Sequence, residues 1–414
     1  MENKCRFNTG LLHEASPKEF GNRQILPPIS QVTAFGYESM EELEKVFSHK
    51  SMGYAYTRIG NPTLAAFEQK INALEGGIGA ISCSSGMAAI SSSLLALCES
   101  GDEIIAGRGL YGGTIDLLRD LEKLGIHTVY ADVLDGDSIR RLATERTRAV
   151  FGEVISNPAL NILDIREAAS AAHEAGVPLI VDSTTATPYL IRPFEYGADI
   201  VVHSTSKYIN GGGNSIGGII IDGGKLDWNF EKHSALSDHK KYRKMAFLLK
   251  LRTDLWENLG GCMSPMNAYL TYIGADTLGL RMQHICENAD ALARALSEEE
   301  DISVNYPALP GNPNHSLAKS QLGGHGGGIL TFRAGSKERA FAIINSLKYA
   351  LIASNIGDIR TLVIHPLSTL YINSDEESTE AAGVFDDLIR VSVGIEDRED
   401  LIDDFLGAVR GSRK

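Results

Sequence analysis

Residues 198–213 read Ala-Asp-Ile-Val-Val-His-Ser-Thr-Ser-Lys-Tyr-Ile-Asn-Gly-Gly-Gly. The apolar run at 198–202 predicts a buried strand, and Lys207 follows that strand in a polar segment that ends in glycines. A lysine at the end of a buried strand is costly unless it is paired, neutral or covalently used. Ser204 and Ser206 lie on either side of it, and their hydroxyls suit a phosphate group.

A second strand end carries an acid. Asp182 ends the apolar run at 178–181, twenty-five residues before Lys207. An acid and a lysine at the ends of successive strands suggest pyridoxal 5′-phosphate (PLP), because PLP enzymes hold the cofactor as a lysine Schiff base with an aspartate at its pyridine nitrogen. The alternative is a solvated lysine and a helix-capping aspartate, which either residue alone would favour. The pair, with the two hydroxyls, favours the cofactor.

Composition limits the class of protein. The chain has 414 residues, of which 43% are hydrophobic and 22% are charged, so we expect a soluble globular protein of two or three domains. Its net charge of −14 disfavours nucleic acid and anionic membranes as partners. No apolar run approaches the roughly 18 residues of a membrane-spanning helix.

The cysteines and the N-terminus predict a compartment. The five cysteines are odd in number and include no Cys-x-x-Cys, so neither a disulfide framework nor a metal site is expected. Reduced thiols indicate the cytoplasm. The first six residues are not followed by the apolar segment of a secretory signal.

The organisation of the chain predicts an α/β fold with a mostly parallel sheet. Residues 1–60 are irregular, and a long helical pattern at 265–296 would lead to a smaller α/β domain. We therefore expect segments 1–60, 61–264 and 265–414. The expected helices are 62–74, 87–98, 114–124 and 165–175, and the expected strands are 80–83, 103–106, 128–130, 149–155, 178–181, 200–202 and 217–221.

Further polar residues lie at predicted strand ends. Ser85 and Gly86 open a helix, whose N-terminal N–H groups could bind a phosphate. Tyr111 could stack on a pyridine ring, and Asn157 could hydrogen-bond a ring hydroxyl. Taken singly, these residues are equally an ordinary helix cap, a surface tyrosine and a turn asparagine.

Two arginines lie far from this group in the sequence. Tyr56 and Arg58, in the irregular N-terminal segment, could complete a phosphate site or be ordinary loop residues. Arg390 lies in a predicted strand with no acid close by before Glu396. The carboxylate of an amino acid would be a natural bidentate partner for Arg390, and a structural ion pair is the alternative.

Together these pieces resemble the Cys/Met-metabolism family of PLP enzymes, from about residue 25 to 410. The motifs are Tyr56-Thr57-Arg58 with Asn61-Pro62-Thr63, Ser85-Gly86-Met87-Ala88, Tyr111-Gly112-Gly113-Thr114, Asn157-Pro158, Asp182, Ser204-Thr205-Ser206-Lys207-Tyr208 and Arg390-Val391-Ser392-Val393-Gly394-Ile395-Glu396-Asp397. The resemblance implies the fold type I, aspartate aminotransferase-like architecture. It also implies a homotetramer of catalytic dimers, in which segment 1–60 contacts the neighbouring subunit.

The resemblance also implies residue roles. Lys207 would form the Schiff base, Asp182 would protonate the pyridine nitrogen, and Tyr111 would stack on the ring and take part in proton transfer. Arg390 would bind the substrate carboxylate. The cofactor-binding set would be Tyr56, Arg58, Ser85, Gly86, Met87, Tyr111, Asn157, Asp182, Ser204, Ser206 and Lys207, with Tyr56 and Arg58 reaching the cofactor of the neighbouring subunit. Tyr56, Asn355 and Arg390 would contact the substrate.

Within the family, the chain resembles the O-acetylhomoserine sulfhydrylases. Asn355-Ile356-Gly357 stands where lyases and cystathionine synthases typically have Ser-Leu-Gly. Met87, where sulfhydrylases usually have Gln, and Asp182-Ser183-Thr184-Thr185, in place of Asp-Asn-Thr-Phe, depart from the pattern. The implied reaction is γ-replacement on O-acetyl-L-homoserine by sulfide or a thiol. Its alternatives are a methionine or cystathionine γ-lyase, and a non-catalytic binding module on the same fold.

Overall fold

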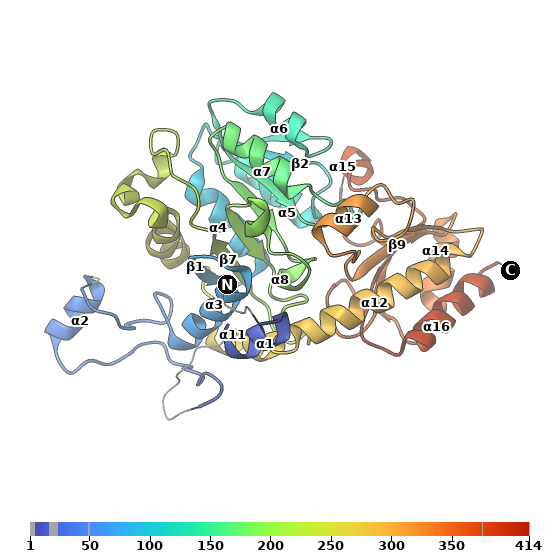
Figure 1. Ribbon diagram of the computed structural model, residues 1–414, viewed down its shortest axis with the longest axis horizontal. Coiled ribbons are helices and arrows are strands. Elements are labelled where there is room, and N and C mark those ends of the chain that lie inside the picture. Colours follow the sequence, from blue (N-terminus) through green and yellow to red (C-terminus); the bar gives the residue numbers. More distant parts are fainter. Residues whose placement is uncertain (1–4, 16–23, 49, 375, 414) are drawn as a thin grey trace.

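The computed structural model describes residues 5–15, 24–48, 50–374 and 376–413. Within them, seven strands form a large sheet in the order β1-β7-β6-β5-β4-β2-β3 (Figure 1). Five strands are mutually parallel, namely β2, β3, β4, β5 and β6. Strand β7 runs antiparallel to both of its neighbours, β1 and β6. The mostly parallel sheet is therefore confirmed. Its strands are β1 (Gly79–Cys83), β2 (Glu103–Gly107), β3 (His127–Ala131), β4 (Thr147–Glu153), β5 (Leu179–Asp182), β6 (Ile200–His203) and β7 (Gly218–Asp222).

Helices cover the large sheet and return the chain between its parallel strands. The four predicted helices are confirmed as α3, α4, α5 and α7. Gly125 and Gly176, with φ of 80° and 71°, end α5 and α7 in the left-handed conformation that glycine adopts without strain. The helices of this part are α3 (Pro62–Glu75), α4 (Gly86–Leu97), α5 (Gly112–Glu122), α6 (Gly136–Leu142), α7 (Ile165–Glu174), α8 (Thr187–Leu190), η2 (Pro193–Tyr196), η3 (Ser234–Met245), α9 (Ala246–Lys250), η4 (Leu251–Trp256) and α10 (Glu257–Leu259).

A second sheet, with the order β10-β11-β12-β9-β8, is formed by strands that follow the long helix α12 in the chain. It has its own apolar core (Figure 1). The expected boundary at 264/265 stays a prediction. The elements are α11 (Pro265–Ala275), α12 (Leu278–Ser297), β8 (Ser303–Asn305), α13 (His315–Gln321), β9 (Ile329–Arg333), α14 (Lys337–Ser346), β10 (Leu351–Ile352), β11 (Leu362–Ile364), α15 (Glu376–Ala381), β12 (Leu388–Ser392) and α16 (Arg398–Gly411).

The long helical pattern at 265–296 is two helices and not one. The break falls at Asp276 and Thr277, between α11 and α12. Both residues are weak helix formers, and the Asp276 carboxylate forms an ion pair with the fully buried Lys70 of α3. The break therefore turns an acidic side chain toward a buried cation.

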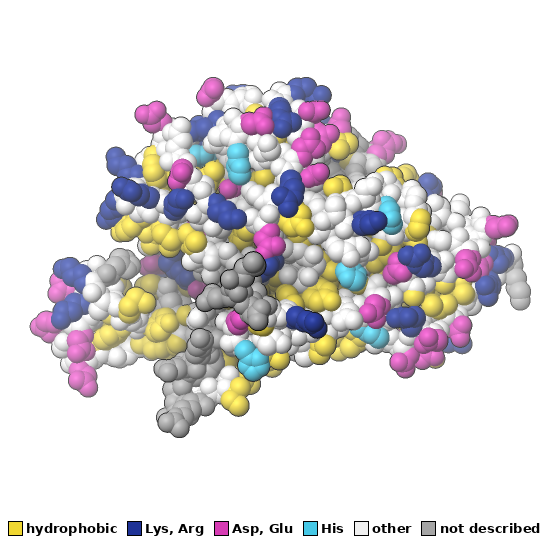
Figure 2. Space-filling view, viewed as in Figure 1, with side chains coloured by type: hydrophobic (Ala, Val, Ile, Leu, Met, Phe, Trp, Pro, Cys, Tyr) yellow, Lys and Arg dark blue, Asp and Glu magenta, His cyan; other side chains and the backbone are white. Residues whose placement is uncertain are grey.

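The N-terminal arm, residues 24–48 and 50–60, extends away from the large sheet (Figure 1). The expectation of irregular structure at 1–60 was wrong in two places, because α1 (Phe7–His13) and α2 (Met40–Phe47) are helices. Each spans only about two turns, which is too short for a clear periodic pattern. The arm exposes the large apolar side chains of Ile25, Val32, Met40, Phe47 and Met52. Figure 2 shows apolar side chains on this part of the surface. The predicted segment also includes 1–4, 16–23 and 49, which lie outside the described residues.

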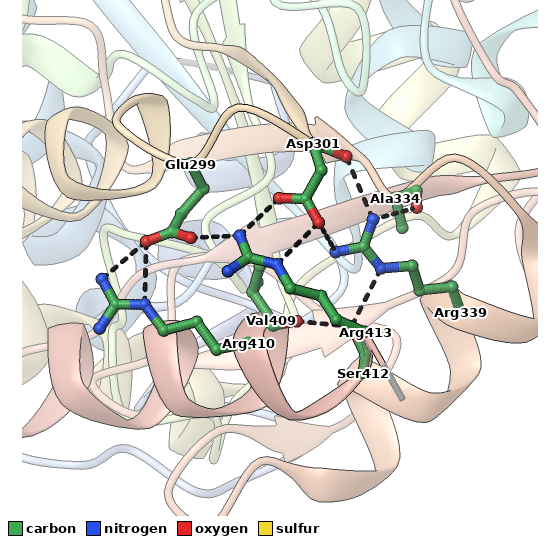
Figure 3. A network of polar contacts seen from close by, with 8 residues as sticks. All are labelled: Glu299, Asp301, Ala334, Arg339, Val409, Arg410, Ser412 and Arg413. Carbon is green, nitrogen blue, oxygen red and sulfur yellow. Dashed lines mark hydrogen bonds and ion pairs between the residues drawn. The ribbon is translucent and has the colours of Figure 1, made fainter.

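Arginines fasten the C-terminal helix α16 to the segment between α12 and β8 (Figure 3). Arg410 binds Glu299 at 2.7 Å, and Arg413 bridges Glu299 and Asp301. Arg339 of α14 also binds Asp301, at 2.5 Å. Hydrogen bonds from Arg413 and then Arg339 hold the pKa of Asp301 below its usual range. In the described part of the chain, no helix is both long and apolar enough to cross a membrane.

Candidate active site

A cavity of about 420 Å³ lies at the carboxyl ends of β4, β5 and β6 and reaches the smaller sheet. Predicted residues from five strand ends of the large sheet, together with one loop residue and one strand residue of the smaller domain, line this one cavity. They are Ser85, Gly86, Met87, Tyr111, Asn157, Asp182, Ser204, Ser206, Lys207, Asn355 and Arg390. Ligands bind at this edge of open α/β sheets.

Lys207 follows β6 and points its amine toward the smaller sheet. Its Nζ donates a hydrogen bond to Oδ1 of Asn355 at 2.5 Å. Burial lowers the pKa of Lys207, and the charge of Arg390 lowers it further. Both effects favour the neutral amine, which is the nucleophilic and proton-accepting form.

Two carboxyl groups lie side by side at the inner end of the cavity. Asp182 and Glu153 are paired across β5 and β4, and both line the cavity. Burial raises the pKa of Asp182, although the Thr184 N–H donates to its Oδ1 at 2.8 Å and lowers it. Burial, followed by the charge of Asp182, raises the pKa of Glu153 to about 8. Burial therefore raises the pKa of both neighbouring carboxyl groups.

Glu153 was not among the predicted site residues. Its carboxylate accepts the backbone N–H of Tyr111 at 2.8 Å, at the point where α5 begins. The sequence feature that could have predicted Glu153 as a site residue is its place near the end of the predicted strand 149–155, on the same edge of the sheet as Asp182. A glutamate there looks like an ordinary surface residue until the loop before α5 covers it.

The start of α4 and the end of β6 form a cradle for an anion. A Cβ built on Gly86 would lie 2.6 Å from the Cβ of Ser204, so the two segments meet only because residue 86 is glycine. Ser85 caps α4 by accepting the Ala88 N–H at 3.0 Å. The free N–H groups of this helix end, with nearby hydroxyls, are suited to a phosphate.

Arg390 reaches the cavity from β12. Only 3% of it is exposed, and burial lowers its pKa to about 10. It donates to the Asn355 carbonyl at 3.0 Å and to Oδ1 of Asn157 at 3.3 Å, while its Nε has no partner among the described residues. The ion pair with Glu396 that we considered does not form, because the Glu396 carboxylate binds Thr361 at 2.6 and 2.7 Å.

Tyr111 and Met87 line the cavity from the first turns of α5 and α4, and Tyr111 is 38% exposed. Tyr56 and Arg58 are not among the lining residues. The Arg58 guanidinium lies 5.4 Å from the centre of the Tyr56 ring and donates to the carbonyl of Glu257 at 2.5 Å. The two lie on the arm, outside this cavity of their own chain.

Comparison with known proteins decides the family. The profile described as "Cys/Met metabolism PLP-dependent enzyme" matches residues 8–410. The chain belongs to this family. Its cofactor is therefore PLP, and the solved structures below confirm the fold type I architecture.

Relatives and solved structures extend over nearly the whole chain. The O-acetyl-L-homoserine sulfhydrylase of Corynebacterium glutamicum is 40% identical, over 97% of this chain and 96% of the relative. A putative O-acetylhomoserine (thiol)-lyase of Campylobacter jejuni, solved with N′-pyridoxyl-lysine-5′-monophosphate, has a TM-score of 0.93 at 33% identity and covers 98% of this chain and 100% of its own. A cystathionine γ-synthase of Xanthomonas oryzae has a TM-score of 0.85 at 30% identity, with 99% of each chain covered.

The residues of this family member fit PLP. The donor set is complementary to the cofactor: a cradle of N–H groups for the phosphate, an amine whose pKa burial lowers, and a buried carboxyl at the end of β5. A Cβ on residue 86 would collide with Ser204, so glycine at this position lets the start of α4 and the end of β6 lie close together beside the cavity.

Proposed function

We propose that this chain catalyses γ-replacement on O-acetyl-L-homoserine, with sulfide or a thiol as the nucleophile and acetate as the leaving group. The observation that carries the proposal is Arg390, a buried guanidinium with an unpartnered Nε in the same cavity as Lys207. A buried guanidinium that keeps a donor free can bind the carboxylate of an amino acid in bidentate geometry. The names of the relatives point to O-acetylhomoserine as that amino acid.

Each residue then has a role. When bound, PLP supplies an electron sink for the bonds of the substrate's α-carbon. Lys207 holds the cofactor and, once released, moves protons at the α- and β-carbons of the substrate. Asp182 holds the proton on the ring nitrogen, and Tyr111 covers the ring and assists the leaving group. The phosphate is held by Ser85, Gly86, Met87, Ser204 and Ser206.

Asn355 links the cofactor side of the cavity to the substrate side. Its side-chain oxygen accepts a hydrogen bond from the Lys207 amine, and its backbone carbonyl accepts one from the guanidinium of Arg390. Asn157, whose proposed partner is a hydroxyl of the ring, also accepts a hydrogen bond from Arg390. One arginine therefore orients both asparagines, and the substrate carboxylate is held close to the amine that moves its protons.

The effect of losing the carboxylate site can be predicted. Arg390→Ala should leave the amount of bound PLP unchanged and reduce kcat/KM by about tenfold to hundredfold, the equivalent of about 1.5–3 kcal/mol for hydrogen bonds to a charged group. Arg390→Lys should restore little, because it lacks the planar fork. Steady-state kinetics with matched cofactor spectra test this. A loss of cofactor at unchanged kcat/KM per bound PLP would remove Arg390 from the substrate site.

We also propose that the active unit is a dimer, two of which form a homotetramer. The support lies in the arm, which exposes large apolar side chains and holds Tyr56 and Arg58 away from the cavity of its own chain. In a dimer these two residues would reach the phosphate of the cofactor in the neighbouring subunit. The cytoplasmic location expected from the cysteines stays a prediction.

Mixed oligomers test the dimer. Arg58→Ala and Lys207→Ala should each be nearly inactive alone, whereas co-folded mixtures should regain activity, because one subunit supplies Arg58 and the other supplies Lys207. About a quarter of the sites in a random dimer mixture should contain both wild-type residues. Activity assays after verified subunit exchange measure the recovery. If none appears, Arg58 acts within its own chain.

A panel of acyl donors tests the proposed substrate. With sulfide present, kcat/KM should be greatest for O-acetyl-L-homoserine, and the O-succinyl and O-phospho esters should react more slowly. Free acetate should appear in equal amount to the sulfur-containing product. A clear preference for the succinyl ester would change the assigned leaving group and would leave the PLP chemistry standing.

A further inference from the structure

The turn that carries Lys207 is held by one buried arginine. Residues 204–211 form a tight turn in which the Gly211 N–H donates to the Lys207 carbonyl at 2.8 Å. The next two carbonyls, of Tyr208 and Ile209, accept hydrogen bonds from Arg281 of α12 at 2.6 and 3.1 Å. The support of the turn therefore comes from a helix 70 residues further along the chain.

Arg281 is buried, and no acid among the described residues accepts a hydrogen bond from it. It is 8% exposed, and burial lowers its pKa to about 10. Besides the two carbonyls of the turn, it donates to the Gly274 carbonyl at 2.7 Å and to the Thr277 hydroxyl at 3.1 Å. A buried guanidinium is costly, and here neutral oxygens alone compensate for its lost hydration. An apolar side chain would fill the same space without this cost in lost hydration, so packing alone does not explain the arginine.

Close glycine contacts show that the turn is tightly enclosed. A Cβ on Gly211, which has φ of 71°, would lie 2.1 Å from NH1 of Arg281. A Cβ on Gly274 would lie 2.3 Å from the carbonyl oxygen of Asn210. On the opposite side, a Cβ on Gly357 would lie 2.4 Å from the backbone nitrogen of Tyr208. The turn therefore packs closely against α11 and α12 and against the loop that carries Asn355.

We propose that Arg281 is a positioning residue for Lys207: it holds residues 207–211 through the carbonyls of Tyr208 and Ile209, and so sets the point from which the Lys207 amine works. This rests on the role proposed for Lys207. The lysine side chain is long and flexible, so its reach is defined only if its backbone is fixed. Arg281 acts through backbone hydrogen bonds and touches neither cofactor nor substrate.

Three variants of the full-length holoenzyme test the role. Arg281→Met removes the donors, Arg281→Lys keeps the charge without the fork, and Arg294→Met is the control on the exposed side of the same helix, where Arg294 pairs with Asp290 at 2.7 Å. Hydrogen–deuterium exchange should be measured for residues 205–211, with β2 as the reference segment. Borohydride reduction and peptide mapping measure the fraction of PLP attached to Lys207, and kinetics give kcat and KM separately.

Arg281→Met should speed exchange in residues 205–211 by about tenfold or more, the scale for losing hydrogen bonds to a charged group, and leave β2 unchanged. The PLP fraction on Lys207 and kcat should fall together, with KM little changed. For Arg281→Lys, the exchange rate, the PLP fraction and kcat should lie between those of Arg281→Met and the wild type. Arg294→Met should match the wild type in all three.

Two results would overturn the proposal. The first is wild-type exchange in residues 205–211 with a wild-type PLP fraction on Lys207. The second is equal acceleration in residues 205–211 and β2, which would mean a general loss of stability. If Arg281→Met does not fold, the same comparison is made with Arg281→Lys. Failure of O-acetylhomoserine as a substrate would not change the exchange result, so the two proposals fail separately.

Discussion

Lys207→Ala should abolish turnover with every substrate. The change removes the amine that holds the cofactor and the same amine that moves protons at the α- and β-carbons, so two functions are lost at once. General acid–base catalysis alone is worth about 10²–10⁴-fold, so less than a hundredth of the wild-type rate should remain. The measurement is kcat under saturating substrate and sulfide, together with the visible spectrum, which should lack the lysine–PLP band.

A matched lysine separates this effect from a general effect of replacing a lysine by alanine. Lys225 donates to the Phe194 carbonyl at 2.7 Å and does not line the cavity, so Lys225→Ala should keep wild-type kcat and the wild-type spectrum. PLP should still associate with Lys207→Ala through the phosphate cradle. Retention of more than a hundredth of the rate by Lys207→Ala would contradict the assignment of this lysine.

Asp182→Asn should have the second-largest effect. The carboxylate balances the charge of a protonated pyridine nitrogen, and a neutral amide cannot. Removal of one preorganised electrostatic group typically costs on the order of 10²–10³ in kcat, and we expect a loss of that size with the fold intact. The Lys207–PLP linkage should still form, because the phosphate and lysine contacts remain. Stopped-flow spectroscopy, kcat and thermal unfolding measure the separate parts.

Asp222→Asn is the matched control. Asp222 is also a buried aspartate at a strand end of the large sheet, 3% exposed, and it binds the Gly224 N–H at 2.8 Å. It does not line the cavity, so its amide variant should keep the wild-type kcat per folded site. Near-wild-type kcat in Asp182→Asn would show that the ring nitrogen is held by another group.

Much of this site could be predicted from the sequence because parallel strands end at one edge. Asp182 and Lys207 follow apolar runs, and the geometry of the sheet brings such residues together wherever the strands pair in order. Gly86 could be placed by the same argument, since it opens a helix directly after a strand. The local sequence pattern therefore predicts the mostly parallel α/β sheet and the residues on the cofactor side of the cavity.

The rest depends on contacts that leave no local pattern. Arg281 acts on the carbonyls of Tyr208 and Ile209, which every residue type presents, from 73 and 72 residues away. The pKa of Glu153 is raised by burial, which appears only when the loop of Tyr111 closes over it. The break at Asp276 follows from a buried partner on α3, which helix propensity does not report.

The measurement that tests the account most directly is product partition with O-acetyl-L-homoserine and sulfide. Mass spectrometry should find homocysteine and acetate in equal amounts, with 2-oxobutyrate and ammonia as minor products, and omission of sulfide should suppress turnover. Equal or greater 2-oxobutyrate, formed at the same rate without sulfide, would contradict γ-replacement and make the protein a γ-lyase. A chain that showed neither product nor a lysine–PLP absorbance would contradict catalysis altogether.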